Sequence, residues 1–205
     1  MSPEAEASPA GAAHISSAGG YTITVTPDTF TMVDYDAATI AETTATLCQR
    51  VGLPVGLAVR VDVDQTTPLG RARIVGTDPV VLSVESGALE DNHRPRQYHE
   101  ANAALVLGRL LVKLRDRLDP AFGDAPDDDA LTLELSAAWD AYATGRLERL
   151  GYTVQRQRRL YQFRVRHGFS DDGDAAFAQL WEGENLSWAR IEELSTGALL
   201  DAKVP

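Results

Sequence analysis

The chain has 205 residues, 44% of them hydrophobic, and its 30 acidic and 19 basic residues give a net charge of −11. This length and composition predict one globular domain over residues 20–197, and the acidic balance argues against a general binder of nucleic acid or anionic membrane. The single cysteine, Cys48, excludes an internal disulfide, and no leader or membrane-spanning run is apparent, so we expect a soluble cytoplasmic protein.

The first half of the chain alternates between strand and helix patterns. Residues 1–19, rich in Ala, Ser, Gly and Pro, predict a disordered tail. Strands are predicted where β-branched residues alternate with others, at 21–26, 57–64, 71–76 and 80–85, and a helix over 36–51. The short link Thr77-Asp78-Pro79 would make the last two strands antiparallel neighbours.

The second half of the chain is predicted to be helical. A helix over 98–118 is apolar on most of its circumference, which is typical of a central position. An acidic loop at 123–129 leads into a helix over 130–150, and shorter helices follow at 155–166, 174–182 and 186–194, before a frayed end at 198–205. The pattern indicates an α+β or α/β fold with a mixed sheet of about four strands, a central helix and a helical C-terminal half.

One short motif carries a family resemblance. His99-Glu100-Ala101-Asn102-Ala103 resembles the HExxH helix of zincin metallopeptidases, with Ala103 in place of the second histidine. Small zincin domains have a similar element order, in which the metal helix follows the edge strand of the sheet, here 80–85, and a later helix supplies an acidic ligand. The resemblance implies a zincin-like fold with an incomplete zinc site, in which Glu134 and Asp140 are the acidic positions available over residues 133–146 of the later helix.

Three interpretations of this motif follow. The leading one is a catalytically degenerate domain, more an inactive than an active enzyme, that has no cofactor and binds or regulates a peptide or protein partner, for example at a sheet edge. An alternative is a metal-dependent hydrolase in which His93, His99 and an acidic residue hold zinc and Glu100 acts as general base. The structural alternative makes His99 a hydrogen-bonded residue at a helix start, where Glu100 favours the helix dipole.

A cluster of arginines suggests a different binding function. Residues 156–167 combine aromatic side chains with five arginines, Arg156, Arg158, Arg159, Arg164 and Arg166. We expect this helix to serve as an interaction module for an acidic partner, whereas the net charge opposes nucleic acid. The structural alternative is a helix that buries Leu160, Phe163 and His167 and pairs its arginines with residues 124–129 or with solvent.

Several other features are interpreted as structural. Ser170-Asp171-Asp172-Gly173-Asp174 lacks the first and last carboxylates of a calcium loop and predicts a helix-capping turn. The three tryptophans, Trp139, Trp181 and Trp188, are predicted to pack in the core, and Cys48 to be buried. The sequence leaves the oligomeric state open.

Overall fold

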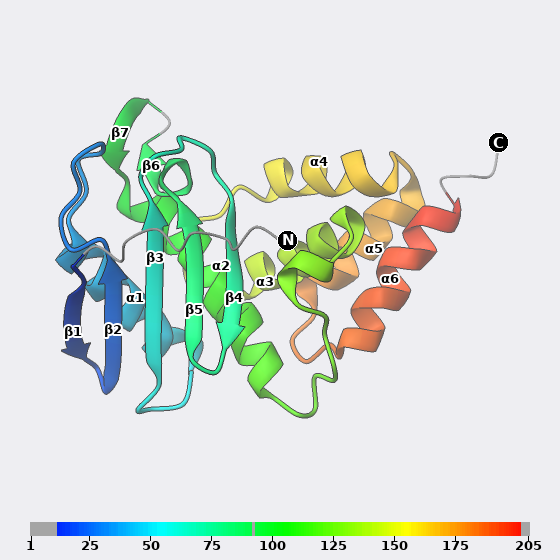
Figure 1. Cartoon of the computed structure of the whole chain (residues 1–205). Coiled ribbons are helices and arrows are strands. Elements are labelled where there is room, and N and C mark those ends of the chain that lie inside the picture. The colour runs from blue at the N-terminus through cyan, green and yellow to red at the C-terminus, as the bar shows by residue number, and fades with distance from the viewer. Residues whose placement is uncertain (1–11, 92, 202–205) are drawn as a thin grey trace, which may run out of the picture. The chain divides into compact units, whose positions relative to one another are not determined.

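A computed structural model describes residues 12–91 and 93–201 of the chain, and these residues form an α+β structure (Figure 1). They divide into two compact units, one built from the chain up to Thr46 with Pro54–Ala103, the other from Leu47–Leu53 with the chain from Ala104 onward. Two helices run from one unit into the other. The prediction of a single domain over 20–197 stays a prediction.

The first unit contains a mixed sheet of five strands in the order β1-β2-β3-β5-β4. The strands are β1 His14–Ala18, β2 Tyr21–Thr26, β3 Ala58–Asp64, β4 Ala72–Thr77 and β5 Val80–Glu85. β2, β3 and β5 are parallel, whereas β1 and β4 are antiparallel to their neighbours. The predicted antiparallel pairing across residues 77–79 is confirmed. β5 lies between β3 and β4, so the expectation that 80–85 is an edge strand is wrong.

Alternation along the strands gives the sheet one apolar face. Ile23, Val61 and Leu82 are fully buried, whereas Thr24 and Arg60 lie at the alternate, more accessible positions. Helix α1, Ala37–Val51, connects the parallel strands β2 and β3. A crossover of this kind is what parallel neighbours require. The Asp36 carboxylate accepts the backbone N–H of Thr39 at 3.1 Å, which caps the start of α1.

The N-terminal end of the sheet differs from the sequence-based expectation. His14–Ala18 form strand β1 and pair with β2, so the predicted disordered tail is wrong for these residues. Gly19 and Gly20 have φ angles of 60° and 86°, a conformation that glycine adopts without strain and that lets the chain reverse. Residues 1–11 of the predicted tail lie outside the described residues. The extra strand explains why the sheet has five strands and not four.

The second unit is helical. Helix α2, Glu100–Leu118, begins in the first unit and continues here, and is followed by α3 Leu133–Arg149, α4 Arg156–His167, α5 Asp171–Glu182 and α6 Trp188–Asp201. An aromatic core includes Trp139, Trp181 and Trp188, all at most 5% exposed, which confirms the prediction for the tryptophans. α6 is longer than expected and buries Ala198, so fraying is wrong for residues 198–201, while 202–205 lie outside the described residues.

Short elements complete the two units. β6 Glu90–Asp91 pairs with β7 Arg94–Tyr98, and single turns of 3₁₀ helix occupy Ser86–Ala88 and Asp128–Ala130. Ser170 caps α5 by accepting the backbone N–H of Gly173 at 3.0 Å, which confirms the predicted capping turn.

Cys48 is buried as predicted, and burial raises the pKa of its thiol to about 12. In the described part of the chain, no helix is long and apolar enough to cross a lipid bilayer.

Candidate functional site

His99 lies at the start of helix α2. Its Nδ1 accepts the backbone N–H of Asn102 at 3.2 Å, and its own backbone N–H donates to the carbonyl oxygen of Leu89 at 2.9 Å. The first amides of a helix have no partner within the helix, so the imidazole satisfies one of them. Glu100 is exposed in the first turn. These contacts agree with the structural alternative for His99.

The residues proposed to hold zinc are distributed over both units. His93 is exposed, and its backbone N–H donates to the Asp91 carboxylate at 2.8 Å. His93 and His99 belong to the first unit, whereas Glu134 and Asp140 belong to the second. Within residues 12–91 and 93–201, no three His, Cys, Asp or Glu side chains form a group that could hold a metal ion. Zinc binding therefore stays a prediction, without a described donor set that fits it.

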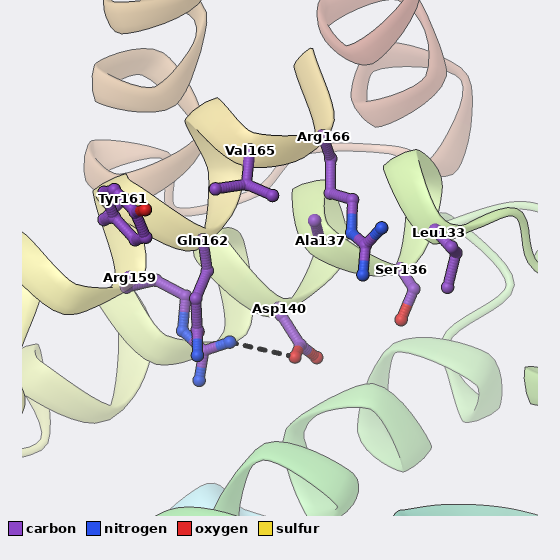
Figure 2. Close-up of a pocket in the computed structure, with 9 residues that line it drawn as sticks. All are labelled: Leu133, Ser136, Ala137, Asp140, Arg159, Tyr161, Gln162, Val165 and Arg166. Carbon is purple, nitrogen blue, oxygen red and sulfur yellow. Dashed lines mark hydrogen bonds and ion pairs between the residues drawn. The ribbon is translucent and has the colours of Figure 1, made fainter. Parts of the chain in front are cut away.

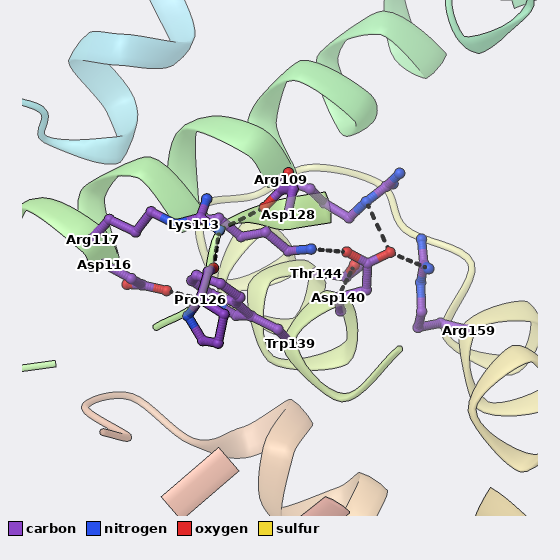
Figure 3. Close-up of polar contacts among 10 residues, drawn as sticks. All are labelled: Arg109, Lys113, Asp116, Arg117, Pro126, Asp128, Trp139, Asp140, Thr144 and Arg159. Carbon is purple, nitrogen blue, oxygen red and sulfur yellow. Dashed lines mark hydrogen bonds and ion pairs between the residues drawn. The ribbon is translucent and has the colours of Figure 1, made fainter. Parts of the chain in front are cut away.

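Asp140 is instead the centre of a cluster of cations in the second unit (Figure 3). Lys113 Nζ lies 2.6 Å from Asp140 Oδ1, and Arg159 Nη1 lies 3.1 Å from Oδ2. Arg109 Nε lies 3.9 Å from the same Oδ2. Arg109 and Lys113 come from α2, Asp140 from α3 and Arg159 from α4, so three helices meet at one carboxylate. Three cations surround one anion.

The charges of this cluster shift the pKa values of its members. Burial opposes ionisation of Asp140, but Lys113, Arg109 and Arg159 together outweigh it and hold the pKa of the carboxyl well below its usual range. Burial lowers the pKa of Arg109 to about 10, a change that Asp140 opposes and Arg159 and Arg158 reinforce. Asp140 and Arg109 are therefore both charged at neutral pH. A carboxylate held in this way is poorly suited to take up a proton or to ligate zinc.

The arginines of α4 differ in their surroundings. Arg159 binds Asp140, Arg164 forms a two-pronged pair with Asp174, and the exposed Arg156 reaches Glu182 at 3.5 Å. Arg158 and Arg166 are exposed and have no ion pair among the described residues. The interpretation that these arginines pair with residues 124–129 is not supported by any of the described pairs. Of the predicted buried stripe, Phe163 and His167 are confirmed at no more than 1% exposed, whereas Leu160 is only partly buried.

A groove of about 410 Å³ runs between α3 and α4 (Figure 2). Asp140 and Ser136 line it from α3, and Arg159, Gln162 and Arg166 line it from α4, at positions i, i+3 and i+7. Apolar side chains border the polar ones, namely Leu133, Ala137, Tyr161 and Val165. The groove thus presents guanidinium groups and apolar surface side by side.

A second polar pair lies deeper in the same unit. His167 Nε2 and Ser195 Oγ are 2.8 Å apart, and His167 Nδ1 lies 3.1 Å from the carbonyl oxygen of Phe163. The carbonyl can only accept, so Nδ1 carries the proton and Nε2 accepts from the serine hydroxyl. A serine bonded to a histidine is also the first part of a nucleophilic site. Both residues are only 1% exposed, so the pair ties α4 to α6 away from any substrate.

The sequence-based reasoning missed the α2 side of the cation cluster. The helix over 98–118 was identified from its apolar residues, and the two cations Arg109 and Lys113 in its interior were not considered. They are four positions apart. Cations at i and i+4 share one face of a helix. Two such charges within an apolar helix were the available signal for a buried anionic partner.

Comparisons of the chain with protein-family models, with curated proteins and with solved structures found no match.

Proposed function

We propose that this protein is a binding module that holds an acidic peptide or protein segment on helix α4 and in the adjacent groove. The observation that carries this proposal is the local excess of cations in a chain whose net charge is −11. A basic surface on an acidic protein attracts an acidic partner while the remainder of the surface repels it, which favours one docking orientation.

The exposed charges of α4 are available to a partner. Arg158 and Arg166 form no ion pair with the described residues, and the pair between Arg156 and Glu182 is long and largely exposed. An exposed pair of this kind contributes between about 0 and 1 kcal/mol, so a partner can replace it with little loss. Arginine is also among the residues that contribute most to protein interfaces.

Apolar side chains beside these arginines supply the second part of the surface. Tyr161 is 61% exposed and Val165 is 51% exposed on α4, and Phe169, just beyond the helix, is 67% exposed. Leu133 lies across the groove on α3 and is 60% exposed. Exposed apolar residues gathered beside a groove are typical of protein interfaces. The partner that fits this surface is a segment that alternates acidic and apolar side chains.

The zincin-like origin and the loss of catalysis remain separate hypotheses, and the binding proposal does not depend on them. The hydrolase alternative, with His93, His99 and Glu100, is supported by no group of three potential metal ligands among the described residues. A nucleic-acid partner is less favoured than a short acidic protein segment, because a polyanion carries more negative charge and is repelled more strongly by a protein whose net charge is −11.

The test is direct binding of a short fluorescent peptide of alternating glutamate and leucine, measured by anisotropy over a range of salt concentrations. We expect salt-sensitive binding that the double variant R158E/R166E weakens at least about tenfold, which is about 1.4 kcal/mol. The matched control R94E/R115E makes the same change in net charge at exposed arginines outside α4. Equal affinity of the two double variants, or no binding to the parent protein, would contradict the proposal.

A further inference from the structure

The cation cluster around Asp140 holds more positive charge than its one carboxylate neutralises. In the described part of the chain, the ion pairs of Arg109, Lys113 and Arg159 all go to Asp140. Three positive charges against one negative charge leave an excess of two. Arg158, the neighbour of Arg159, adds a further repulsive charge that acts on Arg109.

Burial makes this excess unfavourable. The side chains of Lys113, Arg159 and Arg109 are only 6%, 17% and 21% exposed. Water therefore screens their mutual repulsion less than it would at a fully exposed surface. An added anion would lower the electrostatic energy of the cluster.

An anion can reach the cluster from solvent. Arg159 and Asp140 line the groove between α3 and α4, and Gln162 also lines it from α4 (Figure 2). Gln162 can donate through its amide group to an anion held by Arg159. At the other end of the groove, Arg166 interacts electrostatically with Glu134, so its charge is partly balanced. The uncompensated charge is thus concentrated at the Arg159 end.

We infer that the Arg159 end of the groove is a subsite for one oxyanion of the partner, a carboxylate or a phosphate group on an acidic segment. The oxyanion contacts the guanidinium of Arg159 and shares the positive potential of Arg109 and Lys113 with Asp140. A planar guanidinium binds such groups through two parallel N–H donors, and these charge-assisted bonds are about twice as strong as neutral ones. This inference rests on the proposed function, because it assigns the anchoring contact of the same groove.

The first experiment measures affinity of the whole protein for inorganic phosphate, by NMR chemical-shift titration against sodium chloride of equal ionic strength. We expect saturable shifts in the parent protein, binding weakened about tenfold in R159Q, and unchanged binding in the control R115Q. D140N should change affinity in the opposite direction, because it removes the carboxylate that competes for Arg159. Equal phosphate affinity in R159Q and R115Q, or weaker binding in D140N at a temperature where it is folded, would overturn the inference.

The second experiment separates this subsite from the proposed function. Peptides of alternating glutamate and leucine, with one glutamate or one phosphoserine at the centre, are bound to the parent protein, R159Q and R115Q. If R159Q loses more affinity than R115Q for one of the two peptides, the result supports the subsite, and the group at the centre of that peptide identifies the oxyanion. If the peptides bind the parent protein but R159Q and R115Q bind equally, the subsite is wrong and the binding function stands. If neither peptide binds but phosphate does so through Arg159, the function is wrong and the subsite stands.

Discussion

The indole N–H of Trp139 donates to the carboxylate of Asp116 at 3.0 Å inside the second unit, where the two residues are 0% and 5% exposed. The same carboxylate accepts from the guanidinium of Arg146. One acidic side chain of α2 therefore accepts from two donors of α3, and one of the three tryptophans of the core is held in one orientation.

Replacement of Asp116 by alanine is expected to destabilise the protein by about 3–5 kcal/mol, because it leaves the partly buried Arg146 guanidinium and the buried Trp139 N–H without their acceptor. Urea unfolding followed by tryptophan fluorescence measures the change. Asp124→Ala, in an exposed loop, is the matched control and should change stability by less than about 0.5 kcal/mol. Similar unfolding midpoints for the two variants would show that the Asp116 contacts contribute little.

Gly145 and Gly197 provide a matched pair of glycine substitutions. A Cβ at Gly145 would lie 2.1 Å from the carbonyl oxygen of Trp181, whereas a Cβ at Gly197 in α6 meets nothing within 4 Å. We expect Gly145→Ala to destabilise by about 3 kcal/mol and Gly197→Ala to stabilise by about 0.5–1 kcal/mol, since alanine is the better helix former. Thermal unfolding of both variants distinguishes these opposite signs, and a stable Gly145→Ala protein would disprove the close approach of α3 to the end of α5.

The buried His167 should make stability depend on pH. Burial lowers the pKa of His167 in the folded protein, with smaller opposing effects from the carbonyl of Phe163 and from Glu134. As the pH falls below about 6.5, the unfolded chain binds a proton that the folded protein resists, so the free energy of unfolding decreases by at most about 1.4 kcal/mol per pH unit. In His167→Gln, the free energy of unfolding should no longer decrease with pH for this reason. Urea unfolding at about pH 7 and about pH 5 tests it, and parallel slopes in both proteins would refute it.

The imidazole of His99 caps α2, and its removal should lower the free energy of unfolding by the amount that a helix cap typically contributes. His99→Ala is expected to lose about 1 kcal/mol of unfolding free energy, whereas His99→Asn, which keeps a short side-chain acceptor, should lose less. Equal losses in the two variants would argue against a capping role.

Zinc gives a separate readout at the same residue. A role of His99 in helix capping alone predicts that a chelator leaves the unfolding curve of the parent protein unchanged. The hydrolase hypothesis predicts stoichiometric zinc in protein purified without chelator, with loss of that zinc in both His99 variants, so mass spectrometry of metal content decides between them.

Local patterns were sufficient for most of the fold. Period-two alternation located β2, β3 and β5, and the capping residues of α5 were visible as Ser170 and the carboxylates behind it. β1 was missed because its composition, rich in Ser and Ala, has low strand propensity, and its pairing with β2 decides its structure. Strand order is also set by pairing between distant segments, which explains the wrong edge assignment of β5.

The candidate site was only half visible in the sequence. The arginines of α4 stood out because they are neighbours in the chain, but their division into paired and free side chains was not predictable. The sequence suggests Asp140 as a metal ligand because a carboxylate can bind zinc. Its actual partners come from α2 and α4, and nothing in its own helix indicates them. Ion pairs that form only when helices pack against one another cannot be predicted from the sequence pattern of one helix.

Strand β1 is short and joined to the sheet through β2 alone, yet its position has a consequence for anyone who shortens the chain. A truncation at Gly20 would remove the outermost strand and make β2 an edge strand, paired with β3 alone and with unpaired backbone groups on its other side. Unpaired strands of this kind recruit other chains. The new edge, Tyr21–Thr26, is richer in β-branched residues than His14–Ala18, so the shortened protein would be more prone to self-association through β2 than the whole chain is through β1.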